Sequence, residues 1–331
     1  MRAWCIQQDK TLTLEDIPTP SPGPDEVRVR VRAIGVNRAD ILQTQGLYPA
    51  PPGTDNRIPG LEYAGEIEAV GERVRQRKVG DAVMGLVPGC AYAEFIVAHE
   101  REVLTIPNIE GAPLDFAHAA TLPEAFLTAY RALVLEGGLQ SGQWCLVRPA
   151  SAGVGLAAVQ LAAALGARPI GSSRDPGNLA TAREMGLAAQ VRDDASISAA
   201  LQQITGGEGV AVMLDMVGPD WDALLPGLRV EGTLVLIGIL GGNRTSLDLG
   251  GLLFRRQRLA AMTMRSQPLE NRIRLARIFD DRLAPLFAAA RLRPLPLEQF
   301  PFAEAPAAHQ HMLNSAFSGK RVIVLPDTAV A

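Results

Sequence analysis

The sequence predicts an α/β protein with two domains, one an antiparallel, barrel-like β domain and the other a doubly wound parallel sheet. Three observations lead to this prediction. The chain has 331 residues, and one domain takes about 150. Strand-like, turn-rich segments fill the chain up to about residue 118, whereas helical stretches alternate with short apolar runs from about residue 119 onward. Such alternation is typical of β-α-β units in a parallel sheet.

The composition is that of an ordinary globular protein and excludes several functional classes. Hydrophobic residues make up 47% and charged residues 20%, and 32 basic against 35 acidic side chains give a net charge of −3. This balance argues against a protein that works on nucleic acid or on an anionic membrane. No apolar run approaches the roughly 18 residues of a membrane span. The first residues do not resemble a signal peptide, so we expect a cytoplasmic protein.

The cysteines are few and widely separated. Cys5, Cys90 and Cys145 show no C-x-x-C spacing. An odd, sparse set of this kind forms neither a disulfide framework nor a cysteine-rich zinc site. We therefore expect free thiols.

The predicted β domain begins with a loop rich in proline and glycine at residues 18–24. Residues 27–32 then alternate valine and arginine, which predicts a half-buried strand. The prolines at residues 48–53 exclude a helix interior and predict a second loop. Further strands are expected at residues 65–70, 81–86 and 93–97.

The second domain is predicted from four helices and four strands in alternation. The helices are expected at residues 124–136, 155–165, 179–185 and 196–204, and the strands at residues 144–147, 168–171, 210–214 and 233–237. A helix at 269–287, a proline-rich segment at 293–306, a short helix and a strand at 321–325 follow. We expect this tail to return to the first domain, so that residues 1–118 and 266–331 form one domain and residues 119–265 the other.

The turn from Ala150 to Gly155 is the expected pyrophosphate site of a dinucleotide. It follows a predicted strand and leads directly into a helix, whose N-terminus and backbone N–H groups favour phosphate. The first two glycines of the G-x-G-x-x-G pattern are alanines here, so the strand–turn–helix context carries the prediction. An ordinary β-α turn is the alternative.

The residues after the second strand bear on the choice of dinucleotide. An NAD enzyme usually carries an acid there for the ribose hydroxyls. This chain has Ser172, Ser173 and Arg174 instead. Hydroxyls and a guanidinium suit the 2′-phosphate of NADPH better, although Asp175 follows immediately.

Many short segments, in order and at matching spacing, resemble the zinc-free quinone oxidoreductases of the medium-chain dehydrogenase/reductase superfamily, the zeta-crystallin branch. The resemblance covers nearly the whole chain and is strongest to a p53-inducible quinone oxidoreductase-like subgroup, through Tyr48-Pro49 and Leu240–Gly242. The matching segments are Gly35–Asp40, Gln45–Pro49, Pro59–Gly65, Val79–Val83, Ala91–Glu94, Leu122–Ala129, Gly153–Gly155, Leu214–Gly218, Ile237–Gly242, Met264–Ser266, Ala308-His309 and Gly319-Lys320.

The resemblance implies a GroES-like catalytic domain, a Rossmann domain inserted into it and a cleft between the two that binds NADPH. It implies that some residues lie at the nicotinamide and others at the pyrophosphate or the adenosine ribose. Two further residues, Arg265 and Lys320, are expected to close over the cofactor. The expected cofactor positions are Asn37, Thr128, Ala152, Gly153, Val154, Ser172, Ser173, Arg174, Asn178, Met216, Val217, Gly238, Ile239, Arg265 and Lys320.

Three positions depart from the family pattern. Ala152 stands where the family often has glycine. Asn178 stands where a phosphate-binding lysine is common, and Asp193 where a tyrosine often flanks the adenosine. The last two weaken the expected preference for NADPH.

The same resemblance argues against a catalytic metal. Zinc-dependent relatives carry a cysteine at the position of Asn37 and a histidine at the position of Leu61, before Glu62. A catalytic zinc needs three protein ligands, which we cannot assemble here. The scattered His99, His118, His309 and His311 are expected to be structural or surface residues.

Without a metal, hydride transfer to an activated acceptor is the favoured chemistry. A quinone or an α,β-unsaturated carbonyl needs only positioning and a hydrogen-bond donor. Tyr48 is the expected donor, with loop packing as its alternative role. Asn37 is expected to orient the nicotinamide or the substrate, or else to bond a nearby turn. Asp40 and Glu62 are expected to be interior hydrogen-bond partners, with an acid–base role as the alternative.

Three functions therefore stand side by side. The leading hypothesis is a metal-free NADPH-dependent reductase of quinones or enones. An alkenal or enoyl-thioester reductase is the second, and a dinucleotide-binding protein with little turnover, in a structural or sensing role, is the third. The family also suggests a homodimer, formed by edge strands that follow residues 232–242.

Overall fold

The computed structural model describes residues 1–315 and 317–326 and divides into two compact units. The first unit comprises Met1–Glu124 and the chain from Met264 onward, and the second comprises Ala125–Thr263. Within the described residues, no helix has the length and apolar character needed to cross a membrane.

The first unit is built on an antiparallel sheet around its longest strand. The strand order is β16 (Leu297–Pro301), β17 (Lys320–Val324), β3 (Glu26–Val36), β4 (Glu62–Val70), β5 (Ala82–Leu86) and β7 (Val103–Thr105), and β6 (Phe95–His99) also pairs with β3. Only β16 and β17 run parallel. A separate hairpin joins β1 (Arg2–Ile6) to β2 (Leu12–Asp16). The valine–arginine alternation in β3 buries each valine and leaves each arginine partly exposed.

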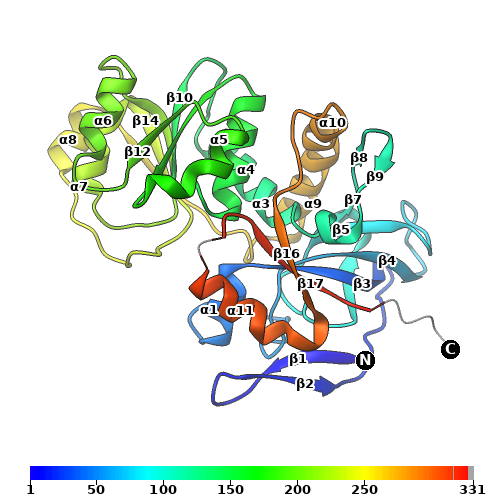
Figure 1. The fold of residues 1–331 in the computed structure, drawn as a ribbon. Helices are drawn as coiled ribbons and strands as arrows, with labels where there is room; N and C mark the ends of the chain where they lie inside the picture. Colours follow the sequence, from blue (N-terminus) through cyan, green and yellow to red (C-terminus); the bar gives the residue numbers. More distant parts are fainter. Residues whose placement is uncertain (316, 327–331) are drawn as a thin grey trace. The chain divides into compact units, whose positions relative to one another are not determined.

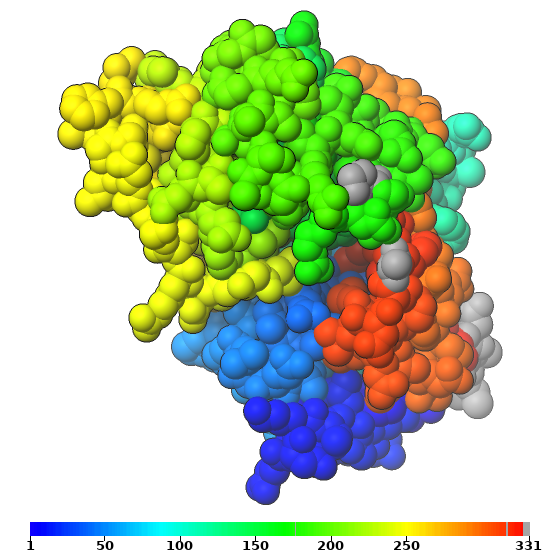
Figure 2. All heavy atoms as spheres, turned by 60° about the vertical axis from the view of Figure 1, so that its left-hand side comes forward, coloured from blue at the N-terminus to red at the C-terminus, as the bar shows by residue number. Residues whose placement is uncertain are grey.

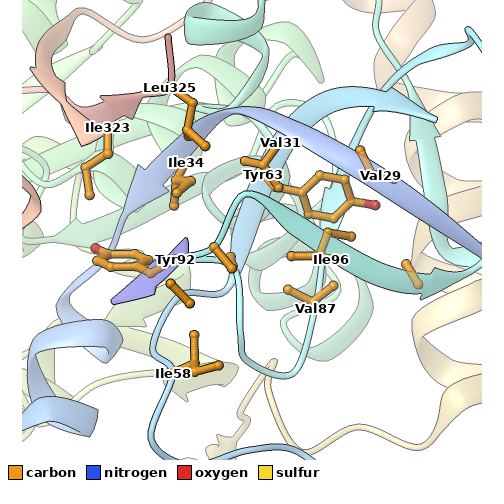
Figure 3. Close-up of a cluster of buried hydrophobic side chains, with 14 of the residues drawn as sticks. Val29, Val31, Ile34, Ile58, Tyr63, Val87, Tyr92, Ile96, Ile323 and Leu325 are labelled. Carbon is orange, nitrogen blue, oxygen red and sulfur yellow. The ribbon is translucent and has the colours of Figure 1, made fainter. Parts of the chain in front are cut away.

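The core of the first unit contains two fully buried tyrosine rings, Tyr63 and Tyr92. Figure 3 shows them among Ile34, Ile96 and the other labelled side chains, with their hydroxyls pointing to opposite sides of the cluster. The Tyr63 hydroxyl has no hydrogen-bond partner among the described residues, whereas Tyr92 reaches a polar network. Of the two tyrosines, Tyr92 is therefore the one whose hydroxyl connects this core to polar side chains among the described residues.

Short helices and loops complete the first unit. They are α1 (Arg38–Thr44), α2 (Phe116–Ala119), α9 (Leu269–Ile278), α10 (Ala284–Ala288) and α11 (Ala305–Asn314), with short strands β8 (Asn108–Ile109) and β9 (Ala112–Pro113). The helix expected at 269–287 is wrong in one respect, because a π-helical turn at Phe279–Leu283 separates α9 from α10.

The second unit is a parallel sheet with the strand order β12, β11, β10, β13, β14, β15. The strands are β10 (Trp144–Arg148), β11 (Arg168–Ser173), β12 (Ala189–Arg192), β13 (Val210–Asp215), β14 (Leu228–Leu236) and β15 (Arg258–Ala261). They lie between α6 (Ile197–Ile204) and α7 (Trp221–Leu224) on one side and α4 (Gly153–Ala164) and α5 (Ala180–Glu184) on the other (Figure 1). This doubly wound order confirms the predicted fold class.

Four segments of the second unit differ from the expected elements. The helix expected at 124–136 is α3 (Pro123–Tyr130) followed by a π-helical segment, Arg131–Glu136. β14 begins at Leu228 instead of residue 233, with a register shift in its pairing to β13. The strands β12 and β15, of four residues each, were not predicted from the sequence pattern.

Candidate active site

A buried ammonium–carboxylate–amide cluster joins three strands or strand ends of the first unit. Lys320 at the start of β17 forms an ion pair with Glu62 at the start of β4, and both side chains are almost fully buried. The Lys320 ammonium also donates to Asn37 Oδ1 at 2.7 Å. The Asn37 amide nitrogen in turn donates to Glu62 Oε1 at 2.9 Å. Both ends of the Asn37 amide are therefore held by the protein.

Glycine at position 35 makes this cluster possible. A Cβ atom built on Gly35 would collide with Glu62 Oε1 and with the carbonyl oxygen of Ala120, closer than real Cβ atoms ever approach such groups. Glu62 Oε2 accepts the backbone N–H of Glu124 at 2.9 Å. Lys320, Asn37 and the Glu124 N–H thus all contact the carboxylate, as expected for an interior hydrogen-bond partner.

A second buried network lies beside the first. Asp40 Oδ2 accepts the backbone N–H of Asn37 at 2.8 Å and the Tyr92 hydroxyl at 3.2 Å, and Tyr92 meets His309 Nε2 at 2.9 Å. Asp40 is fully buried, and its Oδ1 has no hydrogen-bond partner among the described residues. Burial raises the pKa of Asp40 to about 7, against the opposing effects of the Asn37 N–H and the Lys320 charge.

The other two members of this network stay neutral. Burial lowers the pKa of His309 to about 4. Burial and the nearby Asp40 carboxyl raise the pKa of Tyr92 well above its ordinary value. At neutral pH only Asp40 can change its charge here.

Arg265 holds the loop that carries Tyr48. Its guanidinium donates to the carbonyl oxygens of Pro88 and Tyr48 at 2.6 and 2.8 Å and to Gln43 Oε1 at 2.7 Å. The same guanidinium lies over the Tyr48 ring, 5.4 Å from its centroid. The Tyr48 hydroxyl makes no hydrogen bond to any described residue, and burial raises its pKa. Arg265 therefore positions Tyr48, whose phenol keeps its proton at neutral pH.

The contacts of Arg265 and Lys320 bear on their expected place over the cofactor. Both cationic groups are bonded within the first unit, and both residues are buried. Their contact with a cofactor stays a prediction, and so does that of Thr128, which is buried on α3.

The strand–turn–helix of the second unit has the features that a dinucleotide pyrophosphate needs. Ala152 precedes α4 in an extended conformation and provides no side-chain cap, so the first N–H groups of the helix, from Gly153 and Val154, remain for a ligand. A Cβ atom on Gly155 would lie 2.9 Å from Ala150, which explains why glycine stands there. The Ala152 methyl group is accommodated without strain at φ −77°.

The carboxyl end of β11, where the adenosine ribose is expected, contains a buried hydroxyl without a described partner. Ser172 is fully buried, and its Oγ has no hydrogen-bond partner among the described residues. Ser173 Oγ accepts the N–H of Asp175, whose own carboxylate caps Gly177 at 2.9 Å. Arg174 and Asn178 are exposed. The residues present therefore fit a dinucleotide, and Asp175 is occupied by its own turn.

The expected positions on the next two strands lie together. Leu240 N–H donates to the Met216 carbonyl and Gly241 N–H to that of Val217, so the loops after β13 and β14 are joined. A Cβ atom on Gly238 would lie 2.9 Å from the Met216 oxygen. Ile239 is half exposed at this edge.

One buried charge network in the second unit was not anticipated from the sequence. Arg148 at the end of β10 forms ion pairs with Asp193 at 2.8 Å and Asp215 at 3.4 Å. Asp215 also accepts N–H groups from Val217 and Trp221. The one sequence signal for this network is the arginine at position 148, directly before the expected phosphate loop.

The residues that the structure describes contain no ready-made metal site. Within them, no group of three or more histidine, cysteine, aspartate or glutamate side chains is arranged to hold an ion. His99 caps Arg101, His118 pairs with Asp115 and His311 with Glu298.

Comparison with known proteins assigns the same two-part architecture. Residues 23–127 match the family model described as alcohol dehydrogenase GroES-like domain, and residues 153–278 match zinc-binding dehydrogenase. A quinone oxidoreductase of Pseudomonas aeruginosa is 32% identical over 302 residues, covering 88% of this chain and 89% of that protein. These matches define a two-domain dehydrogenase fold.

Solved structures and synthase relatives agree with this assignment. A quinone oxidoreductase from Pseudomonas syringae has a TM-score of 0.86 at 28% identity, and the JamJ enoyl reductase has 0.85 at 26%; each alignment covers 98% of this chain and 99% of the other. Erythronolide synthase of Saccharopolyspora erythraea is 34% identical over 312 residues, which are 89% of this chain and 8% of that enzyme. The chain belongs to the medium-chain dehydrogenase/reductase superfamily of oxidoreductases, as its resemblance to quinone oxidoreductases predicted.

Proposed function

We propose that this oxidoreductase uses NADPH and transfers a hydride, without a metal, to quinones or α,β-unsaturated carbonyl compounds. The observation that carries the proposal is the Lys320 ammonium, which bonds to Asn37, where zinc-dependent relatives carry a cysteine, and to Glu62, the residue after the position of their histidine. A divalent cation there would meet a buried positive charge and would have to displace it from its carboxylate. The remaining amide of Asn37 is a poor zinc ligand.

The proposed class of acceptor goes with the proposed absence of a metal. A metal ion is one way to polarise an isolated carbonyl, whereas a quinone or an α,β-unsaturated carbonyl is already activated by its conjugation. When bound, the reduced nicotinamide supplies the hydride, while the protein supplies orientation and electrostatics. A quinone takes one hydride and one proton to give a hydroquinone; an enone takes the hydride at its β-carbon and then a proton at its α-carbon. Both acceptors need a donor beside the oxygen that becomes negative.

Tyr48 is the donor that we propose for this oxygen. Burial raises the pKa of the phenol, so it remains protonated at neutral pH and can donate a hydrogen bond. Arg265 fixes both the carbonyl oxygen and the ring of the same residue. Asn37 has both ends of its amide engaged, and we propose that it acts by positioning and not by proton transfer.

The test is acceptor-dependent loss of NADPH absorbance with quinones, enones and enals, against a control without acceptor. Tyr48→Phe is expected to lower kcat for enones by about 10²-fold and for quinones less, because quinones are better electrophiles. Tyr63→Phe is the matched control, since the Tyr63 hydroxyl is buried in the core without a described partner. No turnover of any acceptor by protein that binds NADPH would refute the proposal. Unchanged kcat in Tyr48→Phe would assign Tyr48 to loop packing.

Reduction of enoyl thioesters is a second candidate. The similarity to the JamJ enoyl reductase and to erythronolide synthase favours it. The chemistry is the same hydride addition to a β-carbon, so only the shape of the acceptor differs. Comparing kcat/KM for a short enoyl thioester with that for a simple quinone separates the two candidates.

We further propose a modest preference for NADPH over NADH. The exposed Arg174 directly follows β11, two residues after the buried Ser172, while Asp175 is engaged in capping Gly177. A charge-assisted hydrogen bond to a 2′-phosphate is worth about 1.5–3 kcal/mol, or roughly ten- to a hundredfold in affinity. Arg174→Ala is expected to remove most of the preference and to leave NADH kinetics nearly unchanged. Equal or better kcat/KM with NADH in the unmodified protein would refute it.

A homodimer through β15 is the proposed assembly. β15 ends the strand order of its sheet, so its outer edge pairs with no described strand. Beside it, α8 (Leu249–Phe254) leaves Leu249, Leu253 and Phe254 at least 69% exposed. Figure 2 shows this stretch, in yellow, at the surface of the molecule. An open edge next to exposed apolar side chains favours pairing with a second copy. Light scattering should show monomers for Phe254→Asp and dimers for the control Val79→Asp.

The cytoplasm is the proposed compartment. The cysteines are all free, and Cys5 and Cys145 are buried. Free thiols are typical of proteins kept in a reducing compartment.

A further inference from the structure

The network around Arg148 spans the strand ends where the adenosine part of a dinucleotide is expected. Arg148 ends β10, and Asp193 directly follows β12. In the sheet order β12, β11, β10, the strand between them is β11. Strands lie about 4.8 Å apart, so this ion pair reaches roughly 10 Å, across the carboxyl end of β11.

That end of β11 is the ribose end of the proposed site. Ser173 is the last residue of β11, and its carbonyl oxygen accepts the N–H of Asp193 at 3.0 Å. Asp193 therefore starts beside Ser173 and Arg174. A carboxylate that pointed toward Arg174 would compete with a 2′-phosphate for the guanidinium and would repel the phosphate.

The observed geometry prevents this competition. Arg148 Nε donates to Asp193 Oδ1 at 2.8 Å, and both side chains are at least 90% buried. Among the described residues, this hydrogen bond from Arg148 is the one polar contact of the Asp193 carboxylate. Arg174 is exposed and makes no ion pair with any described residue.

We propose that Arg148 is a specificity-determining residue for the dinucleotide. It draws the Asp193 carboxylate across the end of β11 and neutralises it, so that Arg174 alone faces the 2′-position. The inference rests on the proposed use of NADPH. Asp215 contributes by holding Arg148 Nη1, but its own oxygens are also satisfied by the N–H groups of Val217, Gly218 and Trp221. Loss of Arg148 therefore frees Asp193 more than Asp215.

The experiment measures binding of two adenosine fragments by calorimetry, which requires no turnover. Adenosine 2′,5′-bisphosphate carries the 2′-phosphate, and 5′-AMP does not. Wild-type protein should bind the bisphosphate about tenfold more tightly than 5′-AMP. Arg148→Met should lower the affinity for the bisphosphate about tenfold and leave that for 5′-AMP nearly unchanged, so that the two affinities become similar. Arg148→Met combined with Asp193→Asn should restore the ratio. Arg168→Met, which removes a cation at the opposite end of β11, is the matched control and should keep it.

Asp193→Asn alone tests the inference even where Arg148→Met fails to fold. Because Arg148 already neutralises Asp193, this single variant should keep the wild-type ratio within about twofold. A tenfold gain in bisphosphate affinity would show that Asp193 is not neutralised and would overturn the inference. Equal weakening of both fragments in Arg148→Met, without recovery in the double variant, would also overturn it. If wild-type protein shows no preference for the bisphosphate, the proposed cofactor fails first, independently of every variant.

Discussion

Replacing Asp40 by asparagine tests the charge state of a fully buried acid in the candidate site. Asp40 is fully buried, and burial raises its pKa from 3.8 to about 7. A raised pKa in the folded state means that the folded protein binds a proton more tightly than the unfolded chain does. This contribution to stability is complete below about pH 4 and is lost as the pH rises through about 7.

The size of the effect follows from the shift. Each pKa unit corresponds to about 1.4 kcal/mol, so the full shift is worth about 4 kcal/mol, of which about 3 kcal/mol is lost between pH 5 and pH 8. Asparagine keeps an oxygen to accept the Asn37 N–H and the Tyr92 hydroxyl, and its NH₂ takes the place of the unpaired Oδ1. Asp40→Asn should therefore lack this loss and be more stable than wild type at pH 8.

Urea unfolding at pH 5, 6, 7 and 8 measures the difference directly. Other titrating groups contribute equally to both proteins and cancel when the variant is compared with wild type. Asp16→Asn, a change at an exposed carboxyl, is the matched control and should follow the wild-type profile. Infrared spectra at pH 6 should show a protonated carboxyl that Asp40→Asn lacks. Parallel stability profiles for wild type and Asp40→Asn would show that Asp40 ionises normally and would refute the reasoning.

Three further variants or treatments test the neighbouring cluster. Gly35→Ala should destabilise the protein by about 3 kcal/mol or more in thermal unfolding, because its methyl group would meet Glu62. The control Gly250→Ala, on exposed α8, should not. Equal melting temperatures for Gly35→Ala and wild type would contradict this prediction. Lys320→Met leaves the Glu62 carboxylate buried and unpaired and should cost about 3–5 kcal/mol, with recovery when Glu62→Gln is added; no recovery would mean that the loss is not electrostatic. Chelation with EDTA should change neither activity nor melting temperature, and tightly bound zinc by elemental analysis would contradict the metal-free proposal.

The sequence predicted the fold class where the side-chain pattern is local. The alternation in β3 was visible because one face of this strand lies on the core. The strand–turn–helix at α4 was visible because a turn of small residues separates two apolar runs. β12 and β15 were missed since both are short, and β15 contains mostly exposed residues. Tertiary pairing, not local pattern, makes them strands.

The site was predicted less completely for a related reason. Its residue types were found, but their partners were not. Arg148 pairs with an acid 45 residues away, and Tyr92 reaches His309 across 217 residues. No periodicity or spacing connects positions so far apart. The role expected for Asn37, to orient the nicotinamide or the substrate or else to bond a nearby turn, stays a prediction, but its contacts to Lys320 and Glu62 were not foreseen.

The pairing of β17 with β3 sets an order of events during protein synthesis. Lys320 follows its partner Asn37 by 283 residues. A ribosome needs roughly 15–55 s to add that many residues. Until then the nascent first unit has an open edge on β3 and a Glu62 carboxylate without its ammonium. The whole of Ala125–Thr263 leaves the ribosome in the meantime. The second unit can therefore complete its sheet before the first, and a chaperone that shields nascent strand edges would act on β3.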